Sequence, residues 1–509
     1  MKSISSQINV SLYKLTFMRC LIYFLLLVSC QLSAQTITLE LENASSSENL
    51  VKGDTIHIWS DKTPSSDVFS HWSGTAIDYL QKVDEWHTIL VIPENINQSA
   101  FTLTANYETI IEPNIGVISI IQWGQETEEG DFFPAEKEIH FAYPNNPKAI
   151  AFFIHGTGGN ADSWFSNFEK LSMVKDFVHE GYAVFALNSN ETSLGDQDGD
   201  GQVRWENNFS KQDTFTNIDF KNVIHTKQYI DANLGFGDLP VVMVGGSNGA
   251  NFSEFCTGVL DFTASAHLTG NGNSTYFNNF PELKPVIWVQ SRNDNNQNAS
   301  AVTAQANFQK LVDQGVKTEW YWLEKSPSYS KRYMRNLNGT GEAISTSIHE
   351  SLKNQGLLDE DDFLIFDNVN TEFPADFFDN FDISNAQRKD IEYQLNVINA
   401  DHIANGDYNK TIIKFFDDCL SQTTNTVDEA LSTNQFEISP NPAEYATFIR
   451  QEKHSSYDFQ LVDISGKILK EGNSSSSDFE VDLSRFSSGI YFLIINTGYS
   501  EEVHKVIKK

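Results

Sequence analysis

The chain is poor in cysteine, with only four in 509 residues. Cys20 and Cys30 fall in the first 35 residues, which leaves Cys256 and Cys419 for the rest of the chain. Two cysteines allow one disulfide at most, so a disulfide-rich scaffold is excluded. Both lie in apolar patterns with helical spacing, and we expect buried free thiols.

Basic residues are also scarce. The 35 lysines and arginines face 68 aspartates and glutamates, for a formal net charge of -33. A protein this acidic repels polyanions, so nucleic acid and anionic membrane surfaces are not expected partners. The length exceeds that of a single core, and several domains are expected.

Long apolar runs are lacking except near the N-terminus. There, Arg19 precedes an apolar stretch from 21 to 28, and small residues follow up to Ala34. This pattern predicts a signal peptide over residues 1–35. The LVSC stretch ending at Cys30 leaves lipidation as an alternative. We therefore expect a secreted or cell-surface protein with no transmembrane segment.

Residues 36–107 alternate between apolar and polar side chains, as in TITLELE and GDTIHIWS, and no helix-length pattern interrupts them. They predict a small all-β module. The segment resembles the internalin-type B repeat of secreted bacterial proteins, in a single copy. The resemblance implies a spacer or attachment unit and rests on Gly53, Phe69, Trp72, Gly74 and Tyr107.

The other end of the chain is also predicted to be all-β. A polar linker over 423–435 precedes short alternating strands in residues 436–509. The stretches ISPNPA, YDFQLVDISGKIL and LSRFSSGIYFLII resemble the C-terminal sorting domain of type IX secretion substrates. That resemblance implies a β-sandwich recognised by the type IX secretion machinery. The alternative is an ordinary adhesive β-sandwich.

Between these parts, residues 113–422 follow a different pattern. Apolar runs such as AIAFFIH, YAVFALN, VVMVGG and PVIWVQS alternate with amphipathic stretches of helical length. Strands that are apolar on both faces are typical of a parallel sheet covered by helices on both sides. The region is predicted to be an α/β domain with a doubly wound, mostly parallel sheet.

Ser247 lies where one of these strands gives way to a helical pattern, in the sequence GGSNG. Gly245 and Gly249 flank it at the spacing of a nucleophile elbow, a sharp turn in which side chains at those positions would collide. The bare pattern is common, but the strand before it and the helix after it favour a nucleophilic serine over an ordinary turn serine.

A nucleophilic serine requires N–H donors for the oxyanion that forms on attack. The HGTGGN stretch from His155 follows the preceding strand directly, so Thr157 or Gly158 is expected to supply one donor, and Asn248 the other. The alternative, a phosphate-binding glycine turn, lacks both a Walker lysine and a G-x-G-x-x-G pattern. His155 itself is expected to be structural.

The acid and the base are expected to follow the serine in that order. Asp294 comes just after the strand PVIWVQS, where a carboxylate can accept from a histidine; the alternative is a turn-forming aspartate. His402 lies in a polar loop between two amphipathic stretches and is the preferred base. His267 is a weaker candidate, and three further histidines are expected in packing or surface roles: His140, His225 and His349.

In this order, the elbow, the HGTGG loop, Asp294 and His402 resemble the α/β-hydrolase superfamily, specifically its secreted esterase and polyester-depolymerase-like branch. The resemblance implies a serine esterase that forms an acyl-enzyme and needs no cofactor, acting as a monomer on polysaccharide-linked acyl groups or a polyester. The alternatives are a serine peptidase of the same fold and a surface binding protein with an inactive hydrolase domain.

The segment 326–398, between the last predicted strand and His402, is longer than a connection in a minimal hydrolase domain. A helical insertion here is expected to form a lid over the site. Its phenylalanines are expected to belong to a core more than to an acyl pocket. The same core-or-substrate alternative applies to Trp205, for which packing is preferred.

A calcium loop is the last candidate. Asp196, Asp198 and Asp200 alternate before Gly201, as in the first half of an EF-hand loop. The twelfth position, however, is occupied by Asn207 where an acid is expected. A structural Ca²⁺ and a solvated acidic loop are therefore alternatives, and a catalytic metal is not expected because no histidines accompany the acids.

Overall fold

The computed structural model divides the chain into two compact units, Met1–Cys419 and Leu420–Lys509. The predicted signal peptide and Cys30 lie outside the described residues. These are 37–47, 53–61, 67–110, 113–126, 132–206, 217–280, 282–296, 301–430, 436–451, 457–463, 468–496 and 501–509. No helix among them has the length and apolar character needed to cross a membrane.

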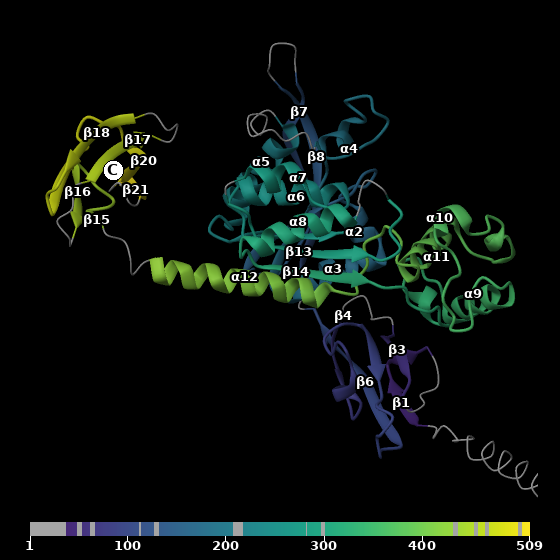
Figure 1. Cartoon of the computed structure of the whole chain (residues 1–509). Helices are drawn as coiled ribbons and strands as arrows, with labels where there is room; N and C mark the ends of the chain where they lie inside the picture. The colour runs from purple at the N-terminus through teal and green to yellow at the C-terminus, as the bar shows by residue number, and fades with distance from the viewer. Residues whose placement is uncertain are drawn as a thin grey trace, which may run out of the picture. The chain divides into compact units, whose positions relative to one another are not determined.

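A sheet of eight strands organises the first unit (Figure 1). Its order is β14-β13-β12-β11-β9-β10-β8-β7, parallel from β14 to β10 and antiparallel at β8 and β7. The predicted doubly wound, mostly parallel sheet is confirmed. The strands are β7 (Asn114–Glu126), β8 (Phe132–Tyr143), β9 (Ala149–Ile154), β10 (Tyr182–Leu187), β11 (Val241–Gly246), β12 (Ala264–Leu268), β13 (Val286–Ser291) and β14 (Thr318–Leu323).

Helices cover both faces of this sheet, as neighbouring residues of β9 show. Phe152 belongs to the core beneath α5 and α6, whereas Phe153 packs edge-on against Trp164 and Phe177 of α2 and α3. Because successive strand residues point to opposite faces, every fully apolar strand needs a helical layer on each side. The helices are α2 (Ser163–Ser166), α3 (Phe168–His179), α4 (Asn190–Leu194), α5 (Ile218–Leu234), α6 (Asn248–Val259), α7 (Ser274–Asn279), α8 (Ala301–Asp313) and α12 (Asn409–Ala430).

The N-terminal module, residues 37–109, is all-β as predicted. Two three-stranded sheets, β1-β6-β4 and β2-β3-β5, enclose a core that includes Trp59 and Trp72. The likeness to a B repeat remains a prediction. The strands are β1 (Thr38–Glu42), β2 (Ala44–Ser46), β3 (Thr55–Ser60), β4 (Asp67–Ser73), β5 (His87–Val91) and β6 (Ala100–Thr109), with the 3-10 turn η1 (Ile77–Tyr79).

The segment 326–398 is helical, as expected, and has a core of its own. The phenylalanines at 373, 377, 378 and 381 all pack in that core, together with Phe366. The segment contacts the N-terminal module: Tyr329 stacks on Trp59 at 4.0 Å between ring centroids, and Lys331 pairs with Asp61 at 2.8 Å. Its elements are η4 (Arg332–Met334), α9 (Glu342–Asn354), α10 (Val369–Glu372), η5 (Phe377–Asn380) and α11 (Asn385–Ile398).

The second unit contains two sheets, β15-β16-β19 and β18-β17-β20-β21, that share one apolar core. Of the predicted linker 423–435, residues 423–430 instead continue helix α12, and residues 431–435 lie outside the described residues. Cys256 and Cys419 are buried and, within the described part of the chain, neither forms a disulfide, as predicted. The strands are β15 (Phe436–Ser439), β16 (Ala446–Gln451), β17 (Tyr457–Asp463), β18 (Ile468–Ser474), β19 (Asp478–Asp482), β20 (Gly489–Asn496) and β21 (Glu501–Lys508).

Candidate active site

Ser247 occupies a strained corner between β11 and α6. Its backbone has φ 51° and ψ -117°, a conformation that residues with a side chain rarely adopt. The corner requires its two flanking glycines. A Cβ atom on Gly245 would lie 2.3 Å from the carbonyl oxygen of Gly249, and one on Gly249 would lie 2.4 Å from that of His155. The glycine spacing in the sequence therefore has a steric cause.

Two loops bring a histidine and an aspartate to this corner. The Nε2 atom of His402 lies 2.9 Å from the Oγ atom of Ser247, and its Nδ1 atom lies 2.7 Å from Oδ2 of Asp294. The Asp294 side chain is 6% exposed and that of His402 is 24% exposed. A neutral imidazole held in this way donates its Nδ1–H to the carboxylate, so Nε2 is free to accept the serine proton.

Of the three N–H groups expected to bind the oxyanion, the contacts around them leave two available. The N–H of Gly158 donates to the carbonyl of Val203 at 2.7 Å, so it is not available to a substrate. Thr157 and Asn248 line the same cavity as Ser247. Asn248 opens helix α6, where the N–H has no acceptor within the helix. Of the two alternatives in the HGTGG loop, Thr157 therefore remains as the partner of Asn248.

The other candidate histidines of the α/β region make contacts that suit structural roles. His155 is buried, and its Nδ1 lies 2.7 Å from the carbonyl oxygen of Gly156; burial lowers its pKa to about 4. Burial lowers the pKa of His267 to about 3, so neither imidazole is a suitable base at neutral pH. The three remaining candidates lie elsewhere: His140 faces Glu138 and Asp162, His225 packs on Trp123, and His349 bonds to Ser328.

A cavity of about 510 Å³ opens in front of Ser247. Its lining is rich in side-chain amides, and its charged members are Lys170 and Arg204, which the sequence did not single out because neither lies in a motif. The amides are Gln202, Asn248, Asn251, Asn271 and Asn296. Trp205 is buried and stacks on Phe252 at 4.6 Å, so it is a packing residue as preferred.

The expectation of a lid needs correction. Of the segment 326–398, only Tyr393 lines this cavity. The reason is that the segment buries its apolar surface in its own core and against the N-terminal module. The segment instead contacts the loop that carries His402. The hydroxyl of Tyr393 donates to the carbonyl of Ala404 in that loop at 2.5 Å.

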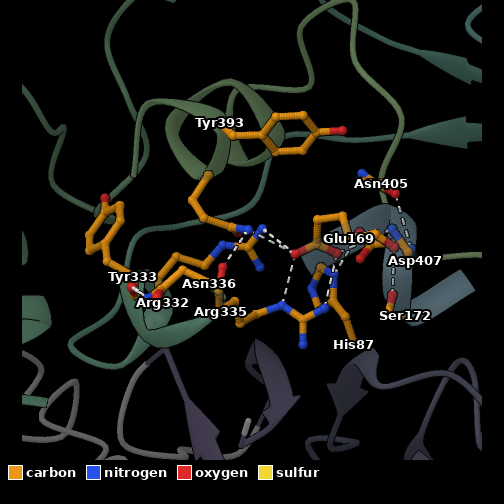
Figure 2. Close-up of polar contacts among 12 residues, drawn as sticks. His87, Glu169, Ser172, Arg332, Tyr333, Arg335, Asn336, Tyr393, Asn405 and Asp407 are labelled. Carbon is orange, nitrogen blue, oxygen red and sulfur yellow. Dashed lines mark hydrogen bonds and ion pairs between the residues drawn. The ribbon is translucent and has the colours of Figure 1, made fainter. Parts of the chain in front are cut away.

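The loop between α11 and α12, which carries His402, is fastened by a buried network of charges (Figure 2). Glu169 of α3 accepts two hydrogen bonds from Arg335, both at 2.9 Å, and one from the N–H of Gly406 at 3.3 Å. One residue further, Asp407 pairs with His87 of the N-terminal module at 3.0 Å. Three separate parts of the first unit thus hold the residues just after His402.

The acidic loop after α4 gathers a different set of carboxylates from the predicted one. Oxygen atoms of Glu191, Asp196 and Asp198 lie within 4.8 Å of one another. Asp200 instead forms an ion pair with Arg204. All three side chains are carboxylates, which are suitable ligands for a hard cation such as Ca²⁺. Glu191 was not expected here because it precedes the aspartates by a helical turn and is outside the loop motif.

Comparisons with known proteins agree with this division of the chain. Residues 437–509 match the model of the secretion system C-terminal sorting domain. Searches of curated protein sequences give no match.

Among solved structures, similar chains include dienelactone hydrolase from Anabaena variabilis ATCC 29413, with 12% identity, a TM-score of 0.29 and coverage of 42% of this chain and 88% of that chain. The Pyrococcus furiosus esterase Pf2001 has 13% identity, a TM-score of 0.28 and coverage of 41% and 83%. An α/β serine hydrolase homologue from Coxiella burnetii has 14% identity, a TM-score of 0.29 and coverage of 42% and 88%. Similarity at this level does not extend to a reaction or a substrate.

Proposed function

We propose that the protein is a serine hydrolase that cleaves carboxylic esters, with Ser247 as nucleophile, His402 as general base and Asp294 as the group that orients the imidazole. The observation that carries this proposal is the 2.9 Å separation between Ser247 Oγ and His402 Nε2, with Asp294 on the other ring nitrogen. This is the arrangement that nucleophilic serine catalysis requires.

In the proposed reaction, Ser247 Oγ attacks the ester carbonyl while His402 accepts its proton. The N–H groups of Thr157 and Asn248 bind the oxyanion of the tetrahedral intermediate. The C–O bond to the alcohol breaks, and His402 gives its proton to the departing oxygen. Water, activated in turn by His402, releases the acid from the acyl-enzyme and regenerates the serine.

The cavity lining favours a hydrated substrate. Its five amide side chains offer hydrogen bonds that an apolar polyester segment cannot use, and leaving them unpaired would cost binding energy. Of the two expected substrate classes, acyl groups on a polysaccharide therefore suit the cavity better than a polyester.

The matched sorting domain indicates secretion or attachment at the cell surface. We propose that the enzyme acts there, on an extracellular polymer, and as a monomer. A structural Ca²⁺ at Glu191, Asp196 and Asp198 is part of the same proposal; calorimetric titration of the full-length protein with Ca²⁺ would measure it.

The decisive experiment compares the purified protein with its Ser247→Ala variant on p-nitrophenyl acetate and on a fluorophosphonate probe. We expect the variant to lose more than about a thousandfold in kcat and to lose all labelling. Ser351→Ala, on the distant helix α9, is the control and should behave as the wild type.

Wild-type labelling without turnover of any ester, but with cleavage of peptides, would favour the serine peptidase. A wild-type protein that is not labelled at all would favour a binding protein with an inactive hydrolase domain.

A further inference from the structure

The cavity in front of Ser247 is lined by cationic side chains, although the whole chain carries a net charge of -33. Lys170 and Arg204 line it, and no aspartate or glutamate does. Its two histidines do not offset this charge, since an imidazole is either neutral or positive. The charged residues that line the cavity are therefore all basic, unlike those of the chain as a whole.

Lys170 differs from Arg204 in having no carboxylate partner. Arg204 is paired with Asp200 and lies 3.9 Å from Asp198. The ammonium of Lys170 donates to the hydroxyl of Ser163 at 3.1 Å and lies 5.4 Å from the Trp164 ring centroid. Within the described residues it forms no ion pair. A partly buried cation without a counter-ion is costly, and an anionic ligand would offset that cost.

Building on the proposed esterase activity, we propose that the substrate carries a carboxylate near its ester bond and that Lys170 binds it. The carboxylate can belong to the alcohol, as in an O-acylated sugar acid of a polysaccharide, or to the acyl group, as in a monoester of a diacid. The amides around the cavity fit the hydroxyl groups of the former.

The test compares kcat/KM for matched anionic and neutral esters, with the wild type, Lys170→Met and the control Lys310→Met. Lys310 lies on α8 and bonds to Asn278 at the surface, away from the cavity. One arm uses O-acetylated polygalacturonate against O-acetylated xylan, and the other uses p-nitrophenyl hemisuccinate against p-nitrophenyl butyrate. The first arm detects recognition of a carboxylate on the alcohol part of the ester. The second arm detects recognition of a carboxylate on the acyl group.

We expect the wild type to favour the anionic ester in one arm and Lys170→Met to lose that preference by about tenfold, the value of one charge-assisted hydrogen bond, while hydrolysing neutral esters normally. Burial lowers the pKa of the Lys170 ammonium to about 8. The preference of the wild type should therefore fall as the pH rises through about 8, and added salt should weaken it.

Equal kcat/KM values for anionic and neutral esters in both arms would overturn the proposal, and so would an equal loss for both in Lys170→Met. Calorimetric binding of an acidic sugar oligomer to Ser247→Ala does not depend on turnover. Binding there that Lys170→Met abolishes would support the carboxylate site even if no ester were cleaved, so the two proposals can fail separately.

A second inference rests on the N-terminal module and is independent of the cavity. Besides the pair between His87 and Asp407, the ammonium of Lys82 donates to the carbonyl of Asp407 at 3.2 Å. Glu85 accepts from the N–H and the hydroxyl of Thr411 at 2.9 and 2.8 Å. Three residues of the module thus hold the chain from five to nine positions after His402.

The same module also stabilises the insertion that supports this loop. Trp86 lies against the guanidinium of Arg335, 3.3 Å from the ring centroid, and Arg335 pairs with Glu169, which accepts from Gly406. Figure 2 shows His87 of the module and Arg335 of the insertion beside Glu169 and Asp407. A spacer would need no such buried contacts.

Again resting on the proposed function, we infer that the N-terminal module is a positioning element of the active site, in which His87 acts through Asp407 to hold His402 within reach of Ser247. Catalysis is sensitive to such placement, because an error of about 1 Å in a catalytic group can cost a hundredfold in rate.

His87→Phe keeps the ring volume but removes the donor to Asp407, and His87→Asn restores a donor. Lys331→Met is the control, since Lys331 joins the module to the insertion through Asp61 without touching the loop. We expect His87→Phe to lower kcat about tenfold with KM unchanged and to alter the pH dependence of kcat. His87→Asn should recover most of the wild-type kcat, and the control Lys331→Met should keep all of it.

If His87→Phe does not fold, Lys82→Met decides the matter, because Lys82 is partly exposed and contacts the same residue. Its kcat should fall several-fold with an altered pH profile. A folded His87→Phe or Lys82→Met with wild-type kcat, or an equal loss in Lys331→Met, would overturn the inference.

Discussion

The N–H of Asn293 donates to the carbonyl of Ala400 at 3.1 Å, so the loops that carry Asp294 and His402 are bonded directly to each other. The side chain of Asn293 also reaches Asp401 at 3.4 Å. Asp294 and His402 are therefore held together by their neighbours and do not rely on their own hydrogen bond alone.

Asp294→Asn should consequently leave the loops in place and impair the chemistry. An amide at this position favours the wrong tautomer of His402, and we expect kcat to fall by about ten-thousandfold with little change in KM. Stopped-flow or steady-state hydrolysis of p-nitrophenyl acetate measures this. Glu324→Gln, the same change at an exposed carboxylate that pairs with Arg292, should lose little, and a comparable loss there would contradict an orienting role for Asp294.

Gly249→Ala should prevent the elbow from forming. The added methyl group would meet the carbonyl oxygens of His155 and Ile154 at 2.4 and 2.7 Å. We expect insoluble protein or a loss of several kcal/mol in the free energy of unfolding, measured by urea titration. Gly341→Ala is the matched control, because nothing lies within 4 Å of its added atom. It should lose about 1 kcal/mol at most, the usual effect of alanine at a helix N-cap.

Glu169→Gln should destabilise the first unit strongly. The carboxylate is fully buried and bonded to Arg335, so the substitution leaves a buried guanidinium without its counter-ion. Breaking such a pair costs about 3–5 kcal/mol. Glu392→Gln removes the exposed pair with Arg388 and should cost less than about 1 kcal/mol. Equal losses in the two variants, measured by denaturant titration, would mean that the buried pair contributes no more than an exposed one.

The free energy of unfolding of the first unit should decrease as the pH rises, because of Glu85 in the N-terminal module. Burial raises the pKa of Glu85 to about 8, so the folded protein keeps a proton that the unfolded chain has already released. Between about pH 4.5 and 8 the folded state binds more protons, and the free energy of unfolding falls with increasing pH. Glu85→Gln keeps an acceptor for Thr411 and should melt higher than the wild type at pH 8. A difference in Tm that is the same at pH 5 and pH 8 would refute this.

Removal of the second unit should leave catalysis unchanged, because Ser247, Asp294 and His402 all belong to the first unit. A specific protease site inserted between Ala430 and Phe436 allows kcat/KM to be compared before and after cleavage of the same preparation. A drop on cleavage would show that the matched sorting domain contributes to activity as well as to export.

Much of the site could be predicted because its constraints are local. A sharp turn requires glycines at fixed spacing, so Gly245 and Gly249 reveal Ser247 without any tertiary information. Asp294 follows a strand, and the carboxyl ends of parallel strands share one edge of a sheet. His402 is indicated by its polar loop, whereas His225 and His349 lie in helical patterns, His267 lies in an apolar run and His140 precedes the oxyanion loop.

The remainder depended on contacts between distant residues. Nothing near Gly158 in the sequence indicates that its N–H bonds to Val203, which decides between the two oxyanion alternatives. The helices of 326–398 were predictable from their periodicity, but periodicity does not tell which surface they pack against. Their contact with the N-terminal module therefore overturned the expectation of a lid.

The hydrogen bond between His87 and Asp407 joins residues 320 positions apart in the chain. Closing so long a loop delays folding, and it cannot happen until nearly the whole first unit has been synthesised. A nascent chain interrupted before His402 carries Ser247 and His87 but neither the proposed base nor Asp407. The proposed hydrolytic activity therefore requires that the chain has been synthesised at least as far as Asp407.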